Sequence, residues 1–219
     1  RDSKITSLFE KNNIHVQSFN DQVIFEKNEI VKKDSKPYTV FTPYKRKWRE
    51  QFSNISLETF QTESLANNFI KTQPFQMPSL KKLGFQQTNY KYPGIKIDEE
   101  IIRNYDKTRD FPALEGTTKL SIHFRHGTIS IRKAVKMALK LNETWLNELI
   151  WREFYMMILW HFPSVVEHSF KAKYDMINWR NNEEEFARWC QGETGYPIVD
   201  AGMRELNETG YMHNRVRMI

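Results

Sequence analysis

The chain lacks several features that proteins use to hold cofactors or to cross membranes. It has one cysteine, Cys190, among 219 residues, which excludes an internal disulfide or a zinc site of several cysteines and fits a reducing compartment. Its longest apolar run, residues 149–162, is interrupted by Arg152 and Glu153, so we expect no membrane-spanning segment. It also lacks a Gly-rich phosphate loop of the Walker or dinucleotide type. A nucleotide cofactor must therefore be held in another way, and we expect no metal site.

The composition supports a folded core and a moderately basic surface. Apolar residues make up 39% of the chain and aromatic residues 14%, enough for a substantial core. The 33 Lys and Arg residues outnumber the 27 Asp and Glu residues, which gives a net charge of +6 and a pI near 9.2. This balance favours a polyanion partner such as nucleic acid, although many proteins without one carry a similar charge.

Hydrophobic periodicity divides the chain into three parts. Residues 1–44 combine a short helix at 5–11 with strand-like stretches at 14–19 and 23–25, as in the last piece of an α/β unit. A basic helix at 44–52 opens a second part, 45–97, whose content of Gln, Asn, Ser, Thr and Pro indicates a connector. The third part, 98–219, has helical patterns at 98–110, 129–141 with Ser130 as the cap, 143–161, 183–191, 198–210 and 213 to the end. We predict a mainly α fold.

Both ends of the chain look like breaks in a longer sequence. The chain starts at Arg1 rather than at Met, and it stops in a rising helical pattern that no Gly, Asn or Pro ends. We therefore expect a central fragment, which would expose the apolar faces of 149–162 and 216–219 and self-associate through them.

The stretch from Trp145 to Tyr155 is the most informative segment. Residues three and four apart share a helix face, so Glu148 lines up with Trp151 and Arg152, and Trp151 lines up with Tyr155. A stacking plane, an acceptor and a cation together suit an unpaired nucleobase. Aromatic-rich helices are also ordinary core elements, and this segment alone leaves both interpretations open.

A hydroxyl-rich turn at residues 116–121 precedes a helical stretch. It offers a glycine, three hydroxyl groups, Lys119 and free backbone amides, which together could form a phosphate cradle. Hydroxyl-rich turns are also common as plain helix caps, and the turn alone fits both.

Several motifs occur together in one order. These motifs are Arg109-Asp110-Phe111-Pro112, 115–121, Gly127-Thr128-Ile129-Ser130, 145–155, 195–204 and Met212-His213-Asn214-Arg215. In this combination the chain resembles the photolyase/cryptochrome family, most closely the bacterial class I photolyases that repair cyclobutane pyrimidine dimers. The resemblance covers essentially the whole chain, loosely before Tyr38 and tightly from Arg109 onwards.

The resemblance implies a fold and an activity. Residues 98–219 would be the N-terminal part of a helical FAD-binding domain, and 1–44 the remnant of a Rossmann-like antenna domain. The family's FAD absorbs blue light and passes an electron to a flipped-out dimer, and a folate- or deazaflavin-type chromophore can serve as antenna. The implied partner is DNA containing pyrimidine dimers, with no membrane, in a bacterial cytoplasm. The alternatives are a cryptochrome-type blue-light receptor and a non-catalytic helical DNA-binding fragment.

The resemblance also implies roles for individual residues. The cofactor site would comprise Tyr105, Thr117, Thr118, Lys119, Leu120, Ser121, Trp145 and Arg152. The catalytic set would be Glu148, Trp151, Asn214 and Met218, with Trp179 as the surface member of an electron-transfer chain. The DNA contacts would be Arg109, Glu148, Trp151, Arg152, Tyr155, Asn214 and Arg215.

The chain departs from the family pattern at two positions of the expected site. Lys119 replaces a usual Arg, so its contact with a phosphate would lose the planar fork. Tyr211 replaces a common Trp and gives a smaller wall beside the flavin. The resemblance also bears on the lesion. His213-Asn214 fits repair of cyclobutane dimers, because the family's enzymes for (6-4) lesions have a His-His pair at this place.

Overall fold

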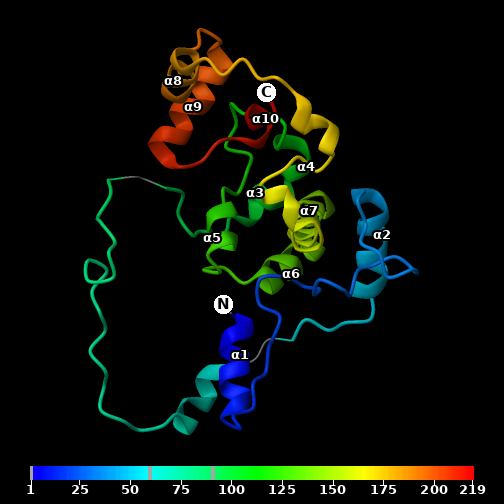
Figure 1. Cartoon of the computed structure of the whole chain (residues 1–219), viewed down its shortest axis with the longest axis vertical. Coiled ribbons are helices and arrows are strands. Elements are labelled where there is room, and N and C mark those ends of the chain that lie inside the picture. Colours follow the sequence, from blue (N-terminus) through cyan, green and yellow to red (C-terminus); the bar gives the residue numbers. More distant parts are fainter. Residues whose placement is uncertain (1, 59–60, 90–91) are drawn as a thin grey trace.

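The computed structural model describes residues 2–58, 61–89 and 92–219 (Figure 1). Residue 1, in the expected antenna remnant, and residues 59–60 and 90–91, in the expected connector, lie outside the described residues. The α-helices are α1 (Asp2–Lys11), α2 (Phe41–Phe52), α3 (Glu99–Arg103), α4 (Tyr105–Thr108), α5 (Ser121–Arg125), α6 (Ile131–Leu141), α7 (Glu143–His161), α8 (Glu183–Gln191), α9 (Pro197–Thr209) and α10 (Asn214–Arg217). Short 3-10 helices are η1 (Thr62–Asn68), η2 (Pro163–Val166) and η3 (Ala172–Met176). The mainly α prediction is confirmed.

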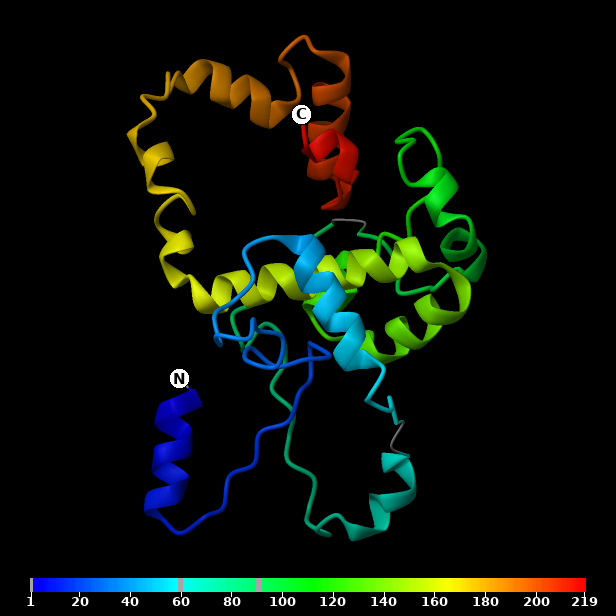
Figure 2. The ribbon, with the colours of Figure 1, turned by 90° about the vertical axis from the view of Figure 1, so that its right-hand side faces the viewer.

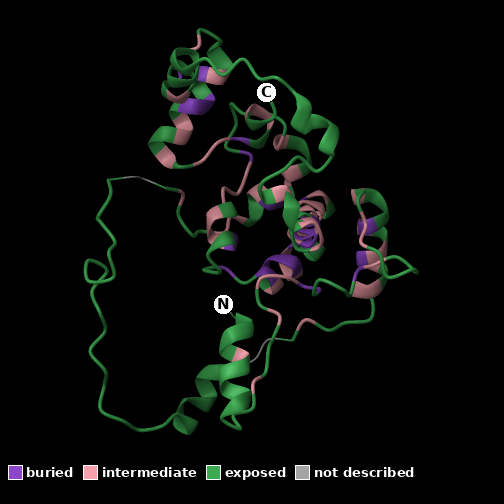
Figure 3. Cartoon of the chain, in the orientation of Figure 1, coloured by how far each residue is buried: buried purple, intermediate pink, exposed green. Residues whose placement is uncertain are grey.

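The core is built around α7, against which α2 and α6 pack. Figure 3 shows the buried residues concentrated on these helices, whereas α1 is exposed along its length. On α6 the buried residues are Ile131, Ala134, Val135 and Ala138, at the spacing of one helix face. The two alanines allow α6 to approach α7 closely.

Asn142 fixes the start of α7 and joins it to the preceding helices. Its Oδ1 accepts hydrogen bonds from the amides of Thr144 at 2.9 Å and Trp145 at 3.1 Å, as an N-cap does. Its Nδ2 donates to the Arg103 carbonyl at 3.1 Å and to Asp106 Oδ1 at 2.7 Å. The start of α7, which carries the expected site, is therefore tied to α3 and α4.

The helix expected at 98–110 is broken into α3 and α4 at Asn104. Asn104 Nδ2 donates to the carbonyl of Glu100 at 3.1 Å and to its side chain at 2.6 Å. An amide side chain that bonds to nearby groups in this way competes with the helical backbone pattern. The prediction of one continuous helix was wrong.

The strands expected at 14–19 and 23–25 do not form, and the described residues contain only an isolated bridge between Val31 and Pro37. The backbone around residues 20–27 is instead satisfied by side chains from the helices. The amides of Ile24 and Phe25 donate to Glu153 on α7, and the carbonyl of Lys27 contacts His161. With its donors and acceptors used in this way, the segment needs no neighbouring strand.

The remaining parts lie on opposite sides of this core. In Figure 2, α8, α9 and α10 lie above α7, while α1 and η1 lie below it. Every residue from 61 to 89 is exposed. The α7 core and the turns beside it therefore position the expected site.

Candidate functional site

Most of the predicted site residues line one cavity of about 730 Å³. The cavity lies between one face of α7, the end of α4, the turn before α5 and the segment leading into α10. Twelve predicted residues line it: Tyr105, Arg109, Thr117, Thr118, Lys119, Leu120, Ser121, Trp145, Glu148, Arg152, Asn214 and Arg215. Its volume is in the range typical of small-molecule and cofactor sites.

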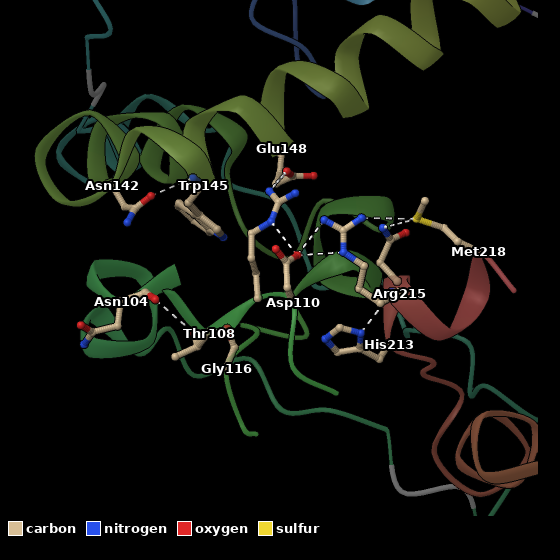
Figure 4. A network of polar contacts seen from close by, with 12 residues as sticks. Asn104, Thr108, Asp110, Gly116, Asn142, Trp145, Glu148, His213, Arg215 and Met218 are labelled. Atoms are coloured by element: carbon tan, nitrogen blue, oxygen red, sulfur yellow. Dashed lines mark hydrogen bonds and ion pairs between the residues drawn. The ribbon is translucent and has the colours of Figure 1, made fainter. Parts of the chain in front are cut away.

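The hydroxyl-rich turn is held against α4 by a close contact of Gly116. Thr108 Oγ1 donates to the Gly116 carbonyl at 3.1 Å (Figure 4). A Cβ added at Gly116 would lie 2.5 Å from Thr108 Cβ, which is too close for two carbon atoms that are not bonded to each other. Only glycine therefore lets the turn approach α4 this closely.

Lys119 of this turn lies beside Tyr211, and both residues depart from the family pattern. Lys119 adopts the left-handed region, with φ of 52°, and its Nζ lies 5.6 Å from the centre of the Tyr211 ring. The hydroxyl groups of Thr117 and Tyr211 are hydrogen-bonded at 2.9 Å. A hydrogen bond to Glu115, at 2.8 Å, raises the pKa of Lys119 despite its partial burial. Tyr211 thus ties the turn to the segment before α10.

A chain of charged groups connects α7 with α10 across the cavity. Arg109 Nη1 donates to Glu148 Oε1, and Arg109 Nε donates to Asp110 Oδ1 at 3.3 Å. Arg215 donates to the same Asp110 oxygen through Nε at 2.8 Å and Nη2 at 2.7 Å (Figure 4). The Arg215 hydrogen bond, supported by Arg109, lowers the pKa of Asp110. Asp110 therefore holds the two arginines together.

Buried aromatic groups form the inner wall of the cavity. Trp145 is buried, and its ring lies 6.5 Å from that of Phe124. Burial, reinforced by the nearby Glu148, raises the pKa of Tyr105 to about 12. The Tyr105 hydroxyl therefore stays protonated at neutral pH and is available as a hydrogen-bond donor.

Arg152 lines the cavity, but two of its donors are already engaged. Its Nη1 donates to the Gln22 carbonyl at 2.6 Å, and its Nη2 donates to the Phe124 carbonyl at 3.1 Å. Burial lowers its pKa, although the neighbouring carboxylate of Glu153 opposes this effect. The guanidinium therefore offers a ligand its charge and its remaining donors.

Trp151 and Tyr155 lie outside the cavity, although the sequence placed Trp151 on one face with Glu148 and Arg152. The Trp151 ring stacks on Phe41 of α2, with centroids 3.5 Å apart and planes 8° apart. The centre of the Trp151 ring also lies 5.5 Å from that of Tyr155, which is 63% exposed. Trp151 therefore does not join Arg109, Arg152 and Arg215 in the cavity, because its indole stacks on Phe41.

Two further predicted residues lie at the edge of the arrangement or away from it. Met218 Sδ accepts contacts from Asn214 Nδ2 at 3.7 Å and from Arg215 Nη1 at 3.6 Å, so it joins the charged chain without lining the cavity. Trp179 lies between η3 and α8, is 67% exposed, and does not line the cavity.

Sequence reasoning placed His213 in a family motif but gave it no role in the site, although it lines the cavity and is only 5% exposed. Its Nδ1 accepts the amide of Arg215 at 3.2 Å and so caps α10 (Figure 4). Nε2 then carries the proton of the neutral ring, and this buried atom has no partner. A histidine directly before a helix was the available signal, but it could not reveal the unpaired nitrogen.

Two known protein families match parts of this chain. The family described as DNA photolyase matches residues 1–65, and the FAD binding domain of DNA photolyase matches residues 145–219. The chain belongs to the photolyase/cryptochrome family. It is 31% identical to a deoxyribodipyrimidine photo-lyase of Synechococcus sp., over all of this chain and 51% of the relative.

Solved structures of the family have the same fold. A class III photolyase from Agrobacterium tumefaciens superposes with a TM-score of 0.71 at 26% identity, over 99% of this chain and 49% of that one. An archaeal photolyase from Sulfolobus tokodaii, solved with two FAD molecules, gives a TM-score of 0.64 at 30% identity, over 99% and 48%. The chain therefore spans about half the length of the relatives it matches.

No helix among the described residues is long and apolar enough to span a membrane.

Proposed function

We propose that this chain is part of a light-driven, FAD-dependent lyase that repairs cyclobutane pyrimidine dimers in DNA. The observation that carries the proposal is the cavity of about 730 Å³ that most of the expected cofactor and DNA residues line together. These residues come from α4, the turn before α5, α7 and α10, which are far apart in the sequence. The family match supports assigning residues 98–219 to the FAD-binding domain and 1–44 to the remnant of the antenna domain.

The wall of the cavity fits the nucleotide half of FAD. The turn from Thr117 to Ser121 offers hydroxyl groups and the single charge of Lys119, as pyrophosphate binding requires. The buried Nε2 of His213, which has no partner, suits an acceptor atom of a ligand. When bound, FAD would supply light absorption and the transferred electron. A second antenna chromophore of folate or deazaflavin type is part of the proposal for the whole protein.

The charged groups at the cavity suit a DNA strand with one base flipped out of the duplex and into the cavity. Arg109 and Arg215 provide cations for phosphates, and Arg152 adds a third positive group. In the proposal, Glu148 hydrogen-bonds the damaged base and stabilises its added charge, while Asn214 and Met218 lie beside the dimer. The exposed Tyr155 and Trp179 are accessible for DNA contact and for electron entry, respectively. Trp151 lies outside the cavity against Phe41, so stacking on a dimer in the cavity would require its side chain to move.

Two further parts of the proposal concern the chain in solution. The exposed side chains of Leu159, Trp160, Met218 and Ile219 support self-association of this chain. The single Cys190 supports a bacterial cytoplasm as its compartment.

The proposal is tested with the full-length protein and an oligonucleotide that carries one thymine dimer. We expect flavin absorbance in the purified protein and dimer loss under blue light but not in the dark. Glu148→Gln should keep most of the repair yield per absorbed photon, because its amide supplies a hydrogen-bond donor in a side chain of the same size, whereas Glu148→Ala should lose it at normal flavin content. Flavin-loaded protein that leaves the dimer intact in the light would refute the proposal.

A further inference from the structure

Arg152 and Glu153 are adjacent on α7, and both hold the same extended segment. Arg152 Nη1 donates to the carbonyl of Gln22 at 2.6 Å. Glu153 Oε2 accepts the amide of Ile24 at 2.7 Å, and its Oε1 accepts the amide of Phe25 at 3.3 Å. Arg152 therefore binds the carbonyl of Gln22, and Glu153 binds the amides of residues 24 and 25.

Glu153 is surrounded by hydrogen-bond donors from two parts of the chain. Besides the two amides, its Oε1 accepts Trp48 Nε1 at 2.7 Å and the Tyr44 hydroxyl at 3.5 Å, both from α2. The residue is only 4% exposed, so these four donors replace water around the carboxylate. In its ionised form the carboxylate offers these donors two acceptor oxygens on one rigid group.

The segment held by Glu153 forms part of the cavity wall. Gln22 and Arg152 both line the cavity, whereas Glu153 does not. The Gln22 carbonyl fixes one end of the Arg152 guanidinium, and the Phe124 carbonyl fixes the other. A shift of the backbone at residues 24–25 would carry the Gln22 carbonyl with it and release Arg152.

We propose that Glu153 is a positioning residue that acts through residues 22–25 to hold the Arg152 guanidinium on the cavity wall. The proposal rests on the proposed function, in which Arg152 contacts FAD or DNA. Glu153 itself touches no ligand in this scheme. It acts in the way that outer partners orient the residues that bind a metal or substrate.

Glu153→Gln is the most informative change because it keeps volume and removes one acceptor. Its amide nitrogen must face either the Ile24 amide or the group of donors around Oε1, and two donors then face each other. Glu153→Asp keeps both acceptors but is one methylene shorter, so it serves as a second variant. Glu143→Gln is the matched control, because Glu143 lies on the same helix in an exposed ion pair with Arg49.

The test is a double-mutant cycle with Arg152→Met in the full-length protein. The readouts are the Kd for a dimer-containing duplex, the FAD content and the stability to urea. We expect Glu153→Gln to weaken DNA binding about fivefold in the parent background and not at all in the Arg152→Met background. Its loss of stability should be the same in both backgrounds, and Glu143→Gln should leave DNA binding unchanged. An equal loss of binding in both backgrounds would overturn the inference.

A second readout separates this inference from the proposed function. Arginine-specific modification by phenylglyoxal, followed by mass spectrometry, reports access to the Arg152 guanidinium without any ligand. We expect faster modification of Arg152 in Glu153→Gln and Glu153→Asp than in the parent protein or Glu143→Gln. Unchanged modification would refute the positioning role. Unchanged DNA and FAD binding in Arg152→Met alone would instead remove Arg152 from the proposed function.

Discussion

Trp151 of α7 stacks face to face on Phe41 of α2, with ring centroids 3.5 Å apart. The contact joins two helices that are also linked by the hydrogen bonds of Glu153, by the ring of Phe154 against Phe41 and Tyr44, and by the ion pair between Arg49 and Glu143. Trp151 also meets Phe154 edge to face at 5.6 Å. This position makes Trp151 a packing residue of the α2–α7 interface in the described structure.

Removal of the Trp151 ring should therefore destabilise the fold. We expect Trp151→Ala to lower the free energy of unfolding by about 2–3 kcal/mol, somewhat less than for a fully buried aromatic residue. Trp151→Phe keeps a ring on Phe41 and should lose much less. Urea denaturation measures both, with Trp179→Ala, at a position that is 67% exposed, as control. Full stability of Trp151→Ala, together with a lost preference for damaged DNA, would favour the stacking role instead.

Gly116→Ala should disrupt the turn that we assign to the cofactor. The new methyl group would collide with Thr108, so the turn must move away from α4 at a cost of about 1–3 kcal/mol. We expect a reduced ratio of flavin to protein in the full-length variant, read from its visible absorbance. Gly94→Ala is the matched control, because nothing lies within 4 Å of its added Cβ. Equal flavin content in the two variants would contradict the assignment.

Asp110 and Arg215 should affect DNA binding in opposite directions. Asp110→Asn removes a negative charge beside Arg109 and Arg215, so binding to undamaged DNA should tighten. Arg215→Ala should weaken binding and reduce the slope of log K against log salt by about one. Asp175→Asn, which makes the same change of charge in a segment outside the cavity, is the control. Weaker binding in Asp110→Asn would show that Asp110 mainly orients the two arginines.

Glu153 should make stability depend on pH. Burial raises its pKa to about 7 from an ordinary 4.5, although hydrogen bonds from Ile24 and Trp48 favour the charged form. Between these two pH values the folded protein holds a proton on Glu153 that the unfolded chain has released. The contribution of this proton to the free energy of unfolding is complete below about pH 4.5 and is lost as the pH rises through about 7. We expect the free energy of unfolding to fall by about 1.4 kcal/mol for each pH unit between these two values. Urea denaturation at several pH values should show a shallower slope for Glu153→Gln, and identical slopes would contradict the assignment.

Helices could be predicted from the sequence because their signals are local. The bounds expected for α7 and α8, 143–161 and 183–191, agree with the structure. The α6 helix ends at Leu141 as expected but begins at Ile131 rather than at 129, and the Ser130 side chain makes no capping bond. These helices depend on apolar spacing and on residues at their own ends.

Features that depend on distant partners could not be predicted in this way. The strand pattern at 23–25 is overridden by Glu153, which supplies acceptors from α7. The side chain of Trp151 turns towards Phe41, which no spacing on α7 reveals. The cavity residues were predicted through the resemblance to a family, because their common position depends on how α4, α7 and α10 pack.

Because Glu153 binds the amides of Ile24 and Phe25, the segment around them can fold only after α7 has been synthesised. The amides of Ile24 and Phe25 leave the ribosome long before their acceptor, since Ile24 and Glu153 are 129 residues apart in the chain. Until α7 emerges, those amides have only water as a partner. Residues 20–27 therefore cannot complete their structure as an early N-terminal unit, and this part of the chain is ordered only once its middle is made.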